Sequence, residues 1–195
     1  LLPLSSTMTL TESESELTLG DEAPAFALHG VDGGTHTLDE YRDNDALLVV
    51  FTCNHCPYAK AKFGELNRLA AANDDLAVVG INSNDAEEYP EDYFAKMVEY
   101  VQSGEVDYDA YLRDESQDVA RAYGATCTPD PFLFRNDDGT FRLAYHGRID
   151  DAMSPDADPE RFHMREAVDA VLDGRAVPFA EELLPSRGCN IKWRG

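Results

Sequence analysis

The stretch ALLVVFTCNHCPY, residues 46–58, places two cysteines three positions apart directly after a run of apolar residues. The first six residues of this stretch are rich in β-branched and aromatic side chains, which is typical of a strand buried on both faces. The apolar face of a helix follows, formed by Ala59, Phe63, Leu66 and Ala70. Cys53 and Cys56 are therefore predicted to lie where a strand gives way to a helix.

This position favours redox chemistry at the two cysteines. The unpaired backbone N–H groups and the dipole at a helix N-terminus stabilise a thiolate, and can lower a thiol pKa from about 8.5 to between about 3.5 and 7.5. We expect Cys53 to be the exposed nucleophile and Cys56, one turn further on, to be the resolving thiol. His55 would carry positive charge beside the Cys53 thiolate, stabilise the reduced form and make the pair more oxidising.

Two other interpretations of the cysteine pair stay open, namely half of a zinc site and two inert cysteines in the core. A structural zinc ion needs four ligands, and the sequence contains no second Cys-x-x-Cys and no His-x-x-x-His. We therefore predict catalytic roles for Cys53, Cys56 and His55, with no metal ion and no other cofactor.

The hydrophobic pattern outward from this site predicts strands and helices in alternation. A hairpin is expected for residues 24–28 and 35–38, around the turn signal Asp32-Gly33-Gly34. Further strands are predicted at residues 76–81, 108–112, 132–134 and 141–145. Further helices are predicted at residues 94–101, 116–123 and 164–171. This order predicts an α/β fold with a central mixed sheet flanked by helices, in one domain.

Together with Thr128-Pro129, which precedes a predicted strand, this order of elements resembles the thioredoxin superfamily over residues 20–174. The resemblance implies a thioredoxin-like fold in which Pro129 is cis and faces the Cys-x-x-Cys motif. It also implies that the backbone of Thr128 is left to pair with a disulfide substrate. Cys127 would lie near the rim of the active site as a third redox thiol or a mixed-disulfide partner, so Thr128, Pro129 and Cys127 are expected to bind substrate. The alternative for Cys127 is a half-buried cysteine at a strand edge.

Other segments resemble the redoxin branch of this superfamily, which contains the AhpC/TSA and peroxiredoxin-like proteins. They are residues 20–26, residues 119–124 and the inserted helix and strand of residues 91–112. Residues 53–58, 145–150 and 188–193 are similar to a peroxiredoxin-like group of uncharacterised function. The resemblance implies thiol-based oxidoreductase chemistry, on disulfides or on peroxides as an antioxidant.

The sequence departs from the peroxiredoxin and thioredoxin patterns at positions that matter for whether peroxides or disulfides are the substrates. Peroxiredoxins carry Pro-x-x-x-Thr-x-x-Cys; aligned on Cys56, the threonine position holds Cys53 and the proline position holds Val49. The peroxidase arginine would fall near residues 129–130, where the sequence has none. The buried aspartate of thioredoxin falls on Leu47, so a base for Cys56 would have to be water or His55.

We therefore predict a thiol-disulfide oxidoreductase with Cys53 and Cys56 as its dithiol-disulfide couple. The alternatives are a thiol-dependent peroxidase, and a non-enzymatic binding protein that senses redox state or holds zinc. The expected partners are protein or small-molecule disulfides and a thiol system that donates electrons.

The charge of the chain argues against two classes of partner. The chain has 16 Lys and Arg against 38 Asp and Glu, a net charge of −22, whereas contacts with nucleic acid or anionic lipid need clustered basic side chains. The longest apolar run, residues 46–51, is far too short to span a membrane. Acidity with only four lysines indicates a cytoplasmic, halophilic protein, since a high-salt cytosol screens self-repulsion; the alternative is an acidic protein with a solvated surface.

The two ends of the chain lack a clear hydrophobic period. Residues 1–19 are expected to be a disordered tail or an expression remnant. Leu1–Thr7 would be such a remnant or the product of upstream translation before the natural start at Met8, and the mobile segment would extend from Met8 to residue 21.

The folded domain is then expected to span residues 20–174. Residues 175–195 would be a C-terminal extension that packs on the domain through Trp193. Cys189 in this extension could cap the site, pair with Cys127 or be a passive thiol.

Overall fold

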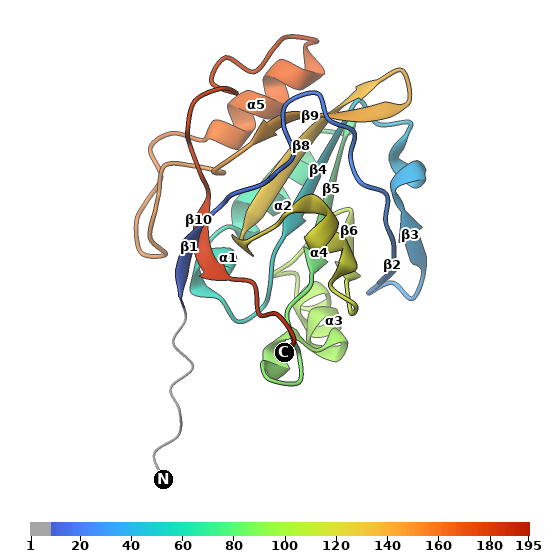
Figure 1. Ribbon diagram of the computed structural model, residues 1–195, viewed down its shortest axis with the longest axis vertical. Helices are drawn as coiled ribbons and strands as arrows, with labels where there is room; N and C mark the ends of the chain where they lie inside the picture. Colours follow the sequence, from blue (N-terminus) through green and yellow to red (C-terminus); the bar gives the residue numbers. More distant parts are fainter. Residues whose placement is uncertain (1–8) are drawn as a thin grey trace.

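The computed structural model describes residues 9–195 and has a seven-stranded mixed sheet at its centre, with the strand order β3-β2-β6-β5-β4-β8-β9 (Figure 1). The strands are β2 (Ala27–Gly30), β3 (Thr35–Thr37), β4 (Ala46–Phe51), β5 (Leu76–Asn82), β6 (Ala110–Arg113), β8 (Asp130–Asp137) and β9 (Thr140–His146). β5 pairs in parallel with β4 and β6, and the other neighbours are antiparallel. The predicted α/β fold, its mixed sheet and its N-terminal hairpin are confirmed.

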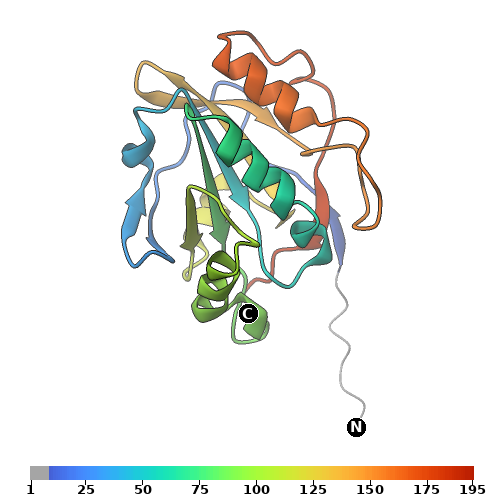
Figure 2. The ribbon, with the colours of Figure 1, turned by 180° about the vertical axis from the view of Figure 1, so that it is seen from behind.

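Helices cover both faces of this sheet. The α-helices are α1 (Pro57–Lys60), α2 (Phe63–Ala72), α3 (Phe94–Gln102), α4 (Asp118–Tyr123) and α5 (His163–Leu172), and the 3-10 helices are η1 (Leu38–Tyr41) and η2 (Pro90–Asp92). α2 and α5 pack on one face, which is nearer the viewer in Figure 2, and α4 packs on the other.

The central strand β4 is buried on both faces, as its apolar sequence predicts. Leu47, Val49 and Phe51 contribute to the core beneath α4, whereas Ala46, Leu48 and Val50 contribute to the core beneath α2 and α5. Successive side chains of a strand point to opposite faces, so a strand between two helical layers needs apolar residues throughout. This packing fixes the end of β4, from which the Cys-x-x-Cys motif continues.

The helix predicted after the motif is divided in two. α1 ends at Lys60 and α2 begins at Phe63. Between them the N–H of Lys62 donates to the carbonyl of Ala59 at 3.0 Å, an i to i−3 bond that tightens the chain into a turn. The apolar spacing of the two helices is continuous through this turn, and the sequence pattern therefore did not reveal it.

A second sheet, with the strand order β1-β10-β7, joins both ends of the described chain. Its strands are β1 (Leu10–Glu12), β10 (Arg187–Asn190) and β7 (Cys127–Thr128). The expectation of a mobile segment up to residue 21 is wrong for residues 10–12. These strands have two to four residues, too few to show a period of two.

The expectations for residues 1–8, including the remnant and the start at Met8, lie outside the described residues. In the C-terminal extension the guanidinium of Arg121 lies 5.0 Å from the ring centroid of Trp193. None of the helices in residues 9–195 is long and apolar enough to cross a bilayer.

Candidate active site

The cysteine motif lies at the end of β4, but the second cysteine, not the first, is at the helix N-terminus. Cys56 is the N-cap of α1, with an extended backbone, and Pro57 occupies the first helical position. Proline is well suited to that position because it has no N–H to leave unpaired and its fixed φ suits a helix. The prediction that Cys53 sits at the helix N-terminus is therefore wrong by one turn.

Both sulfur-bearing side chains are buried. Cys53 and Cys56 are each 0% exposed and pack with Ala59 of α1 and Cys189 of β10, against which Tyr58 also lies. Cys53 is thus not the exposed nucleophile that the sequence predicted. A substrate can reach either sulfur only after one of the segments that cover them, such as β10, moves.

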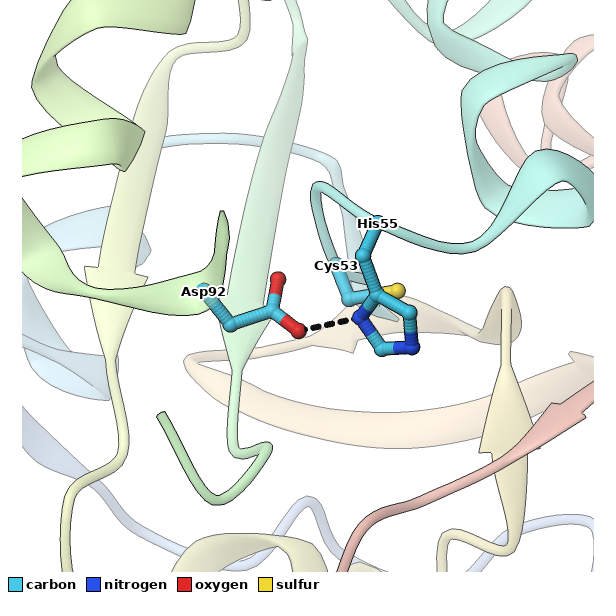
Figure 3. A group of neighbouring side chains, drawn as sticks. All are labelled: Cys53, His55 and Asp92. Carbon is cyan, nitrogen blue, oxygen red and sulfur yellow. Dashed lines mark hydrogen bonds and ion pairs between the residues drawn. The ribbon is translucent and has the colours of Figure 1, made fainter. Parts of the chain in front are cut away.

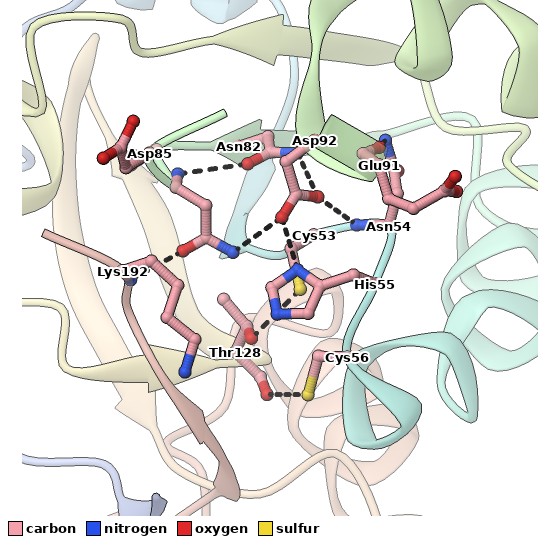
Figure 4. Close-up of polar contacts among 12 residues, drawn as sticks. Cys53, Asn54, His55, Cys56, Asn82, Asp85, Glu91, Asp92, Thr128 and Lys192 are labelled. Carbon is pink, nitrogen blue, oxygen red and sulfur yellow. Dashed lines mark hydrogen bonds and ion pairs between the residues drawn. The ribbon is translucent and has the colours of Figure 1, made fainter. Parts of the chain in front are cut away.

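The loop that carries Thr128 and Pro129 faces both cysteines, as the resemblance implied. The Thr128–Pro129 peptide bond is cis. Cys53 Sγ lies 3.3 Å from Thr128 Oγ1, and the thiol of Cys56 donates to the carbonyl of Thr128 at 3.6 Å (Figure 4). Thr128 therefore contacts both members of the pair, through its hydroxyl and its carbonyl respectively.

The backbone edge of Thr128 is occupied, contrary to the expectation that a substrate would pair with it. β10 runs antiparallel to β7, with Cys189 opposite Thr128 and Asn190 opposite Cys127. Gly188 makes this approach possible, since a Cβ on it would lie 1.8 Å from the carbonyl oxygen of Thr128. The C-terminal strand thus takes the place that was assigned to substrate.

The surroundings of the two thiols separate their acidities. Hydrogen bonds from Cys189 and then from Cys53 lower the pKa of Cys56 well below that of an ordinary cysteine, with smaller contributions from the backbone N–H groups of Ala59 and Cys189. Burial, the hydrogen bond with Cys56 and the charge of Asp92 raise the pKa of Cys53. Cys56 is therefore the more acidic thiol of the pair, and Cys53 is the less acidic one.

Cys127 is fully buried and does not lie at a rim. Its thiol donates to the carbonyl of Pro129 at 3.6 Å, and burial raises its pKa. The strand edge position was predicted, but β10 covers it. Cys127 behaves as a small apolar side chain in this position.

His55 is held by a residue that the sequence analysis missed, the buried Asp92 of η2. Nδ1 of His55 is hydrogen-bonded to Oδ2 of Asp92, with the sulfur of Cys53 beside the ring (Figure 3). The negative charge of Asp92 faces the positive charge that a protonated His55 would carry. His55 thus has a carboxylate partner that the sequence did not predict, and its role beside Cys53 stays a prediction.

Asp92 is at the centre of a network of buried amides (Figure 4). It accepts hydrogen bonds from the backbone N–H of Asn54 at 2.7 Å and from the side chains of Asn82 and Asn84 at 3.1 Å each. Burial opposes its charge, but the bond with His55 and these N–H donors outweigh burial and lower the pKa of Asp92. A buried carboxylate with four hydrogen-bonded partners holds the motif in place.

The C-terminal strand also reaches this network. The backbone N–H of Lys192 donates to Oδ1 of Asn84 at 2.9 Å, and its ammonium lies 5.3 Å from the ring centroid of Tyr89. Tyr89 in turn stacks on His55, with centroids 4.9 Å apart. The segment after β10 thus contacts Tyr89, whose ring stacks on a face of the imidazole that Asp92 binds at its edge.

Three side chains of the site are close enough to share a metal ion. Ligand atoms of Cys53, His55 and Asp92 all lie within 4.8 Å of one another, which in residues 9–195 is the one such group of three. However, Nδ1 of His55 and Oδ2 of Asp92 are hydrogen-bonded to each other, and a structural zinc ion needs a fourth ligand. Within the described chain the arrangement suits a proton-carrying pair better than a closed zinc site.

Comparison with known proteins places this site in a family. The sequence model of the AhpC/TSA family matches residues 19–144. No curated protein matches the chain. An uncharacterized conserved protein from Geobacillus kaustophilus has 40% sequence identity and a TM-score of 0.87, with 96% of this chain and 98% of that chain covered.

Two other solved structures extend the comparison. A hypothetical protein from Sinorhizobium meliloti has 43% identity and a TM-score of 0.86, with 95% of this chain and 99% of that chain covered. Peroxidoxin BcpB from Mycobacterium tuberculosis has 19% identity and a TM-score of 0.60, with 82% and 99% covered. The last of these similarities shows a shared fold.

Proposed function

Since the chain belongs to the AhpC/TSA family, we propose that it is a thiol-disulfide oxidoreductase with Cys53 and Cys56 as its couple. Cys56 is the attacking thiolate and Cys53 is the resolving thiol, the reverse of the order that spacing alone suggests. The observation that carries this assignment is that Cys56, at the N-cap of α1, packs with both Cys53 and Cys189, whose thiols lower the pKa of Cys56.

The reaction follows from this arrangement. The Cys56 thiolate attacks one sulfur of a substrate disulfide, the substrate S–S bond breaks, and the first substrate thiolate leaves. Cys53 then loses its proton and attacks the sulfur of Cys56 in the mixed disulfide, and the second substrate thiolate leaves. The substrate gains two electrons, and the protein is left with a Cys53–Cys56 disulfide that an external thiol system reduces.

His55 is the proposed acceptor of the Cys53 proton. One of its ring nitrogens lies within 4.8 Å of Cys53 Sγ, and Nε2 is buried without a hydrogen-bond partner among residues 9–195. Asp92 at Nδ1 favours the tautomer that leaves Nε2 free to accept a proton, and stabilises the imidazolium that results.

The cover over the sulfurs favours small substrates. Cys53 and Cys56 are fully buried, and β10 occupies the edge of Thr128. An extended protein segment would have to displace β10, whereas a low-molecular-weight disulfide needs a smaller opening. We therefore propose small-molecule disulfides as the first substrate class.

The test is a single-turnover reaction of the reduced protein with glutathione disulfide, and separately with insulin. Release of two thiols per protein, with a Cys53–Cys56 disulfide left behind, is the expected result for glutathione disulfide, and Cys56→Ser should abolish it. A wild-type protein that releases no thiol from either substrate would contradict the proposal.

Peroxide reduction is a second candidate, favoured by the same position of Cys56. The thiolate would attack one oxygen of the peroxide to give a sulfenic acid, and Cys53 would condense with it to form the disulfide and water. Two features argue against this reaction: Val49 stands where the peroxiredoxin pattern has proline, and residues 129–130 include no arginine. Rapid consumption of hydrogen peroxide that is lost in Cys56→Ser, without comparable disulfide reduction, would favour it.

A further inference from the structure

Cys189 is held firmly against the site because β10 is paired on both of its edges. It lies opposite Leu10 of β1 and opposite Thr128 of β7. The N–H of Asn190, the next residue, also donates to the carbonyl of Thr9 at 2.9 Å. The position of Cys189 is therefore set by backbone pairing on two sides and not by a loose chain end.

The side chain of Cys189 is part of the cysteine cluster. It is 2% exposed and packs with Cys53, Cys56 and Ala59. Its thiol is hydrogen-bonded to the sulfur of Cys56, as is that of Cys53. Cys56 thus has two thiols within hydrogen-bond reach, and only one of them belongs to the Cys-x-x-Cys motif.

The approach of β10 is built into the sequence next to this cysteine. Gly188 has room for no side chain, since a Cβ would lie 1.8 Å from the carbonyl oxygen of Thr128 and 2.6 Å from its carbonyl carbon. The absence of a side chain lets the strand come close enough for Cys189 to reach α1. Gly188 thereby permits the contact between the sulfurs of Cys189 and Cys56.

We propose that Cys189 is a second resolving thiol, which exchanges with the Cys53–Cys56 disulfide to form a Cys56–Cys189 disulfide. The proposal rests on the proposed function, because it needs Cys56 as the redox-active sulfur. It assigns a catalytic role to a residue outside the motif.

The exchange is balanced within the chain. Cys189 loses its proton and attacks the sulfur of Cys56, the Cys53–Cys56 bond breaks, the Cys56–Cys189 bond forms, and Cys53 takes up a proton. One S–S bond replaces another, so no oxidant or reductant is consumed. The same attack on a mixed disulfide at Cys56 would release the substrate thiolate directly.

The consequence is a covalent bond between the cover and the site. In the Cys56–Cys189 form, β10 is linked to α1, and the strand that lies over the sulfurs cannot leave. Cys53 is then a thiol again, beside His55 and Thr128. The oxidised protein would thus have two isomers, one with β10 free to move and one with β10 linked.

The experiment maps disulfides by mass spectrometry after exposure of reduced variants to glutathione disulfide. In Cys53→Ser we expect a Cys56–Cys189 link and little glutathione on Cys56, whereas in Cys53→Ser/Cys189→Ser glutathione should remain on Cys56. Cys53→Ser/Cys127→Ser is the matched control and should form the same Cys56–Cys189 link.

A lasting glutathione adduct on Cys56 in Cys53→Ser, or a Cys56–Cys127 link, would overturn the proposed role of Cys189 but not the proposed function. Failure of Cys53→Ser/Cys189→Ser to take up glutathione would instead overturn Cys56 as the attacking sulfur, and with it the proposed function.

Disulfide mapping of the wild-type chain tests the proposal without any substitution. Partial oxidation should yield both disulfide isomers, and a complete absence of the Cys56–Cys189 isomer at every ratio of glutathione to its disulfide would contradict the proposal.

Discussion

Cys189 lies directly opposite Thr128 in the antiparallel pairing of β10 with β7. The C-terminal strand therefore fills the backbone edge beside the cis-Pro129 loop and covers both cysteines of the motif. This relationship turns an expected open redox site into a closed one. It also brings a third sulfur to Cys56.

The closed site predicts slow modification of native thiols. In the reduced protein, all four cysteines are buried, so a chromogenic thiol reagent should react with them much more slowly than with the unfolded chain. Stopped-flow or manual kinetics with and without denaturant would measure the difference. Reaction of Cys53 at the rate of a cysteine in a short peptide would show that the cover is not closed in solution.

Gly188→Ala should loosen the cover. The added Cβ has no room against Thr128, and overpacking of this kind typically costs about 1–3 kcal/mol. We expect a lower free energy of unfolding and faster reaction of the native thiols in the folded variant. Urea unfolding and the kinetics above provide the two measurements.

Gly64→Ala is the matched control for that variant. Gly64 lies in α2, and nothing is within 4 Å of the position of its Cβ. Alanine there should stabilise the protein by about 0.5–1 kcal/mol and leave thiol reactivity unchanged. Equal destabilisation by the two substitutions would remove the case for a close contact at Gly188.

The Cys56 thiolate predicts a defined pH dependence of stability. Because the folded state lowers the pKa of Cys56, its contribution is complete above the unfolded pKa of about 8.5 and declines as the pH falls below it. The difference in unfolding free energy between reduced wild type and Cys56→Ser should therefore shrink from about pH 8.5 to about pH 6, by at most about 1.4 kcal/mol per pH unit. A difference that stays constant over this range would mean that Cys56 is an ordinary thiol.

Asp92→Asn should slow resolution more than attack. The substitution removes the charge that holds Nδ1 of His55, so the proposed proton acceptor of Cys53 loses its partner, whereas the residues that contact Cys56 stay unchanged by it. In a Cys189→Ser background, we expect the mixed disulfide on Cys56 to form at a similar rate and to be resolved about tenfold more slowly, a part of the usual general-base contribution. Rapid quench with mass spectrometry separates the two steps.

The same substitution should cost about 1–3 kcal/mol of stability, because one buried donor of the amide network loses its acceptor. Glu91→Gln is the control. It removes the same charge one residue away, on an exposed side chain, and should alter the rate of neither step. Equal slowing of attack and resolution by Asp92→Asn would reduce Asp92 to a purely structural residue.

Long hydrophobic patterns made most of the fold predictable from the sequence. The run at residues 46–51 and the spacing of Phe94, Met97, Val98 and Val101 match β4 and α3. The short strands β1 and β10 carry no period and are held by pairing with distant segments, so no local pattern could reveal them. The cover over the site was missed for this reason.

The site was predictable in part. The cysteine pair and the facing cis-Pro129 are recognisable in the sequence, but the register of α1 is not, and one turn exchanges the environments of Cys53 and Cys56. Asp92 had no local signal. A clue existed in Asn82-Ser83-Asn84, which lies at the carboxyl end of β5 as the cysteine motif lies at that of β4, because the carboxyl ends of neighbouring parallel strands meet at one edge.

The most direct test of the account is to find which sulfur attacks a disulfide. Reduced Cys53→Ser/Cys189→Ser and Cys56→Ser/Cys189→Ser would be mixed with glutathione disulfide, and intact-mass spectrometry would follow the adduct on each over time. We predict an adduct on Cys56 in the first variant and almost none on Cys53 in the second at matched times. The reverse result, a rapid adduct on Cys53 and none on Cys56, would contradict the assignment of Cys56 as the attacking thiolate.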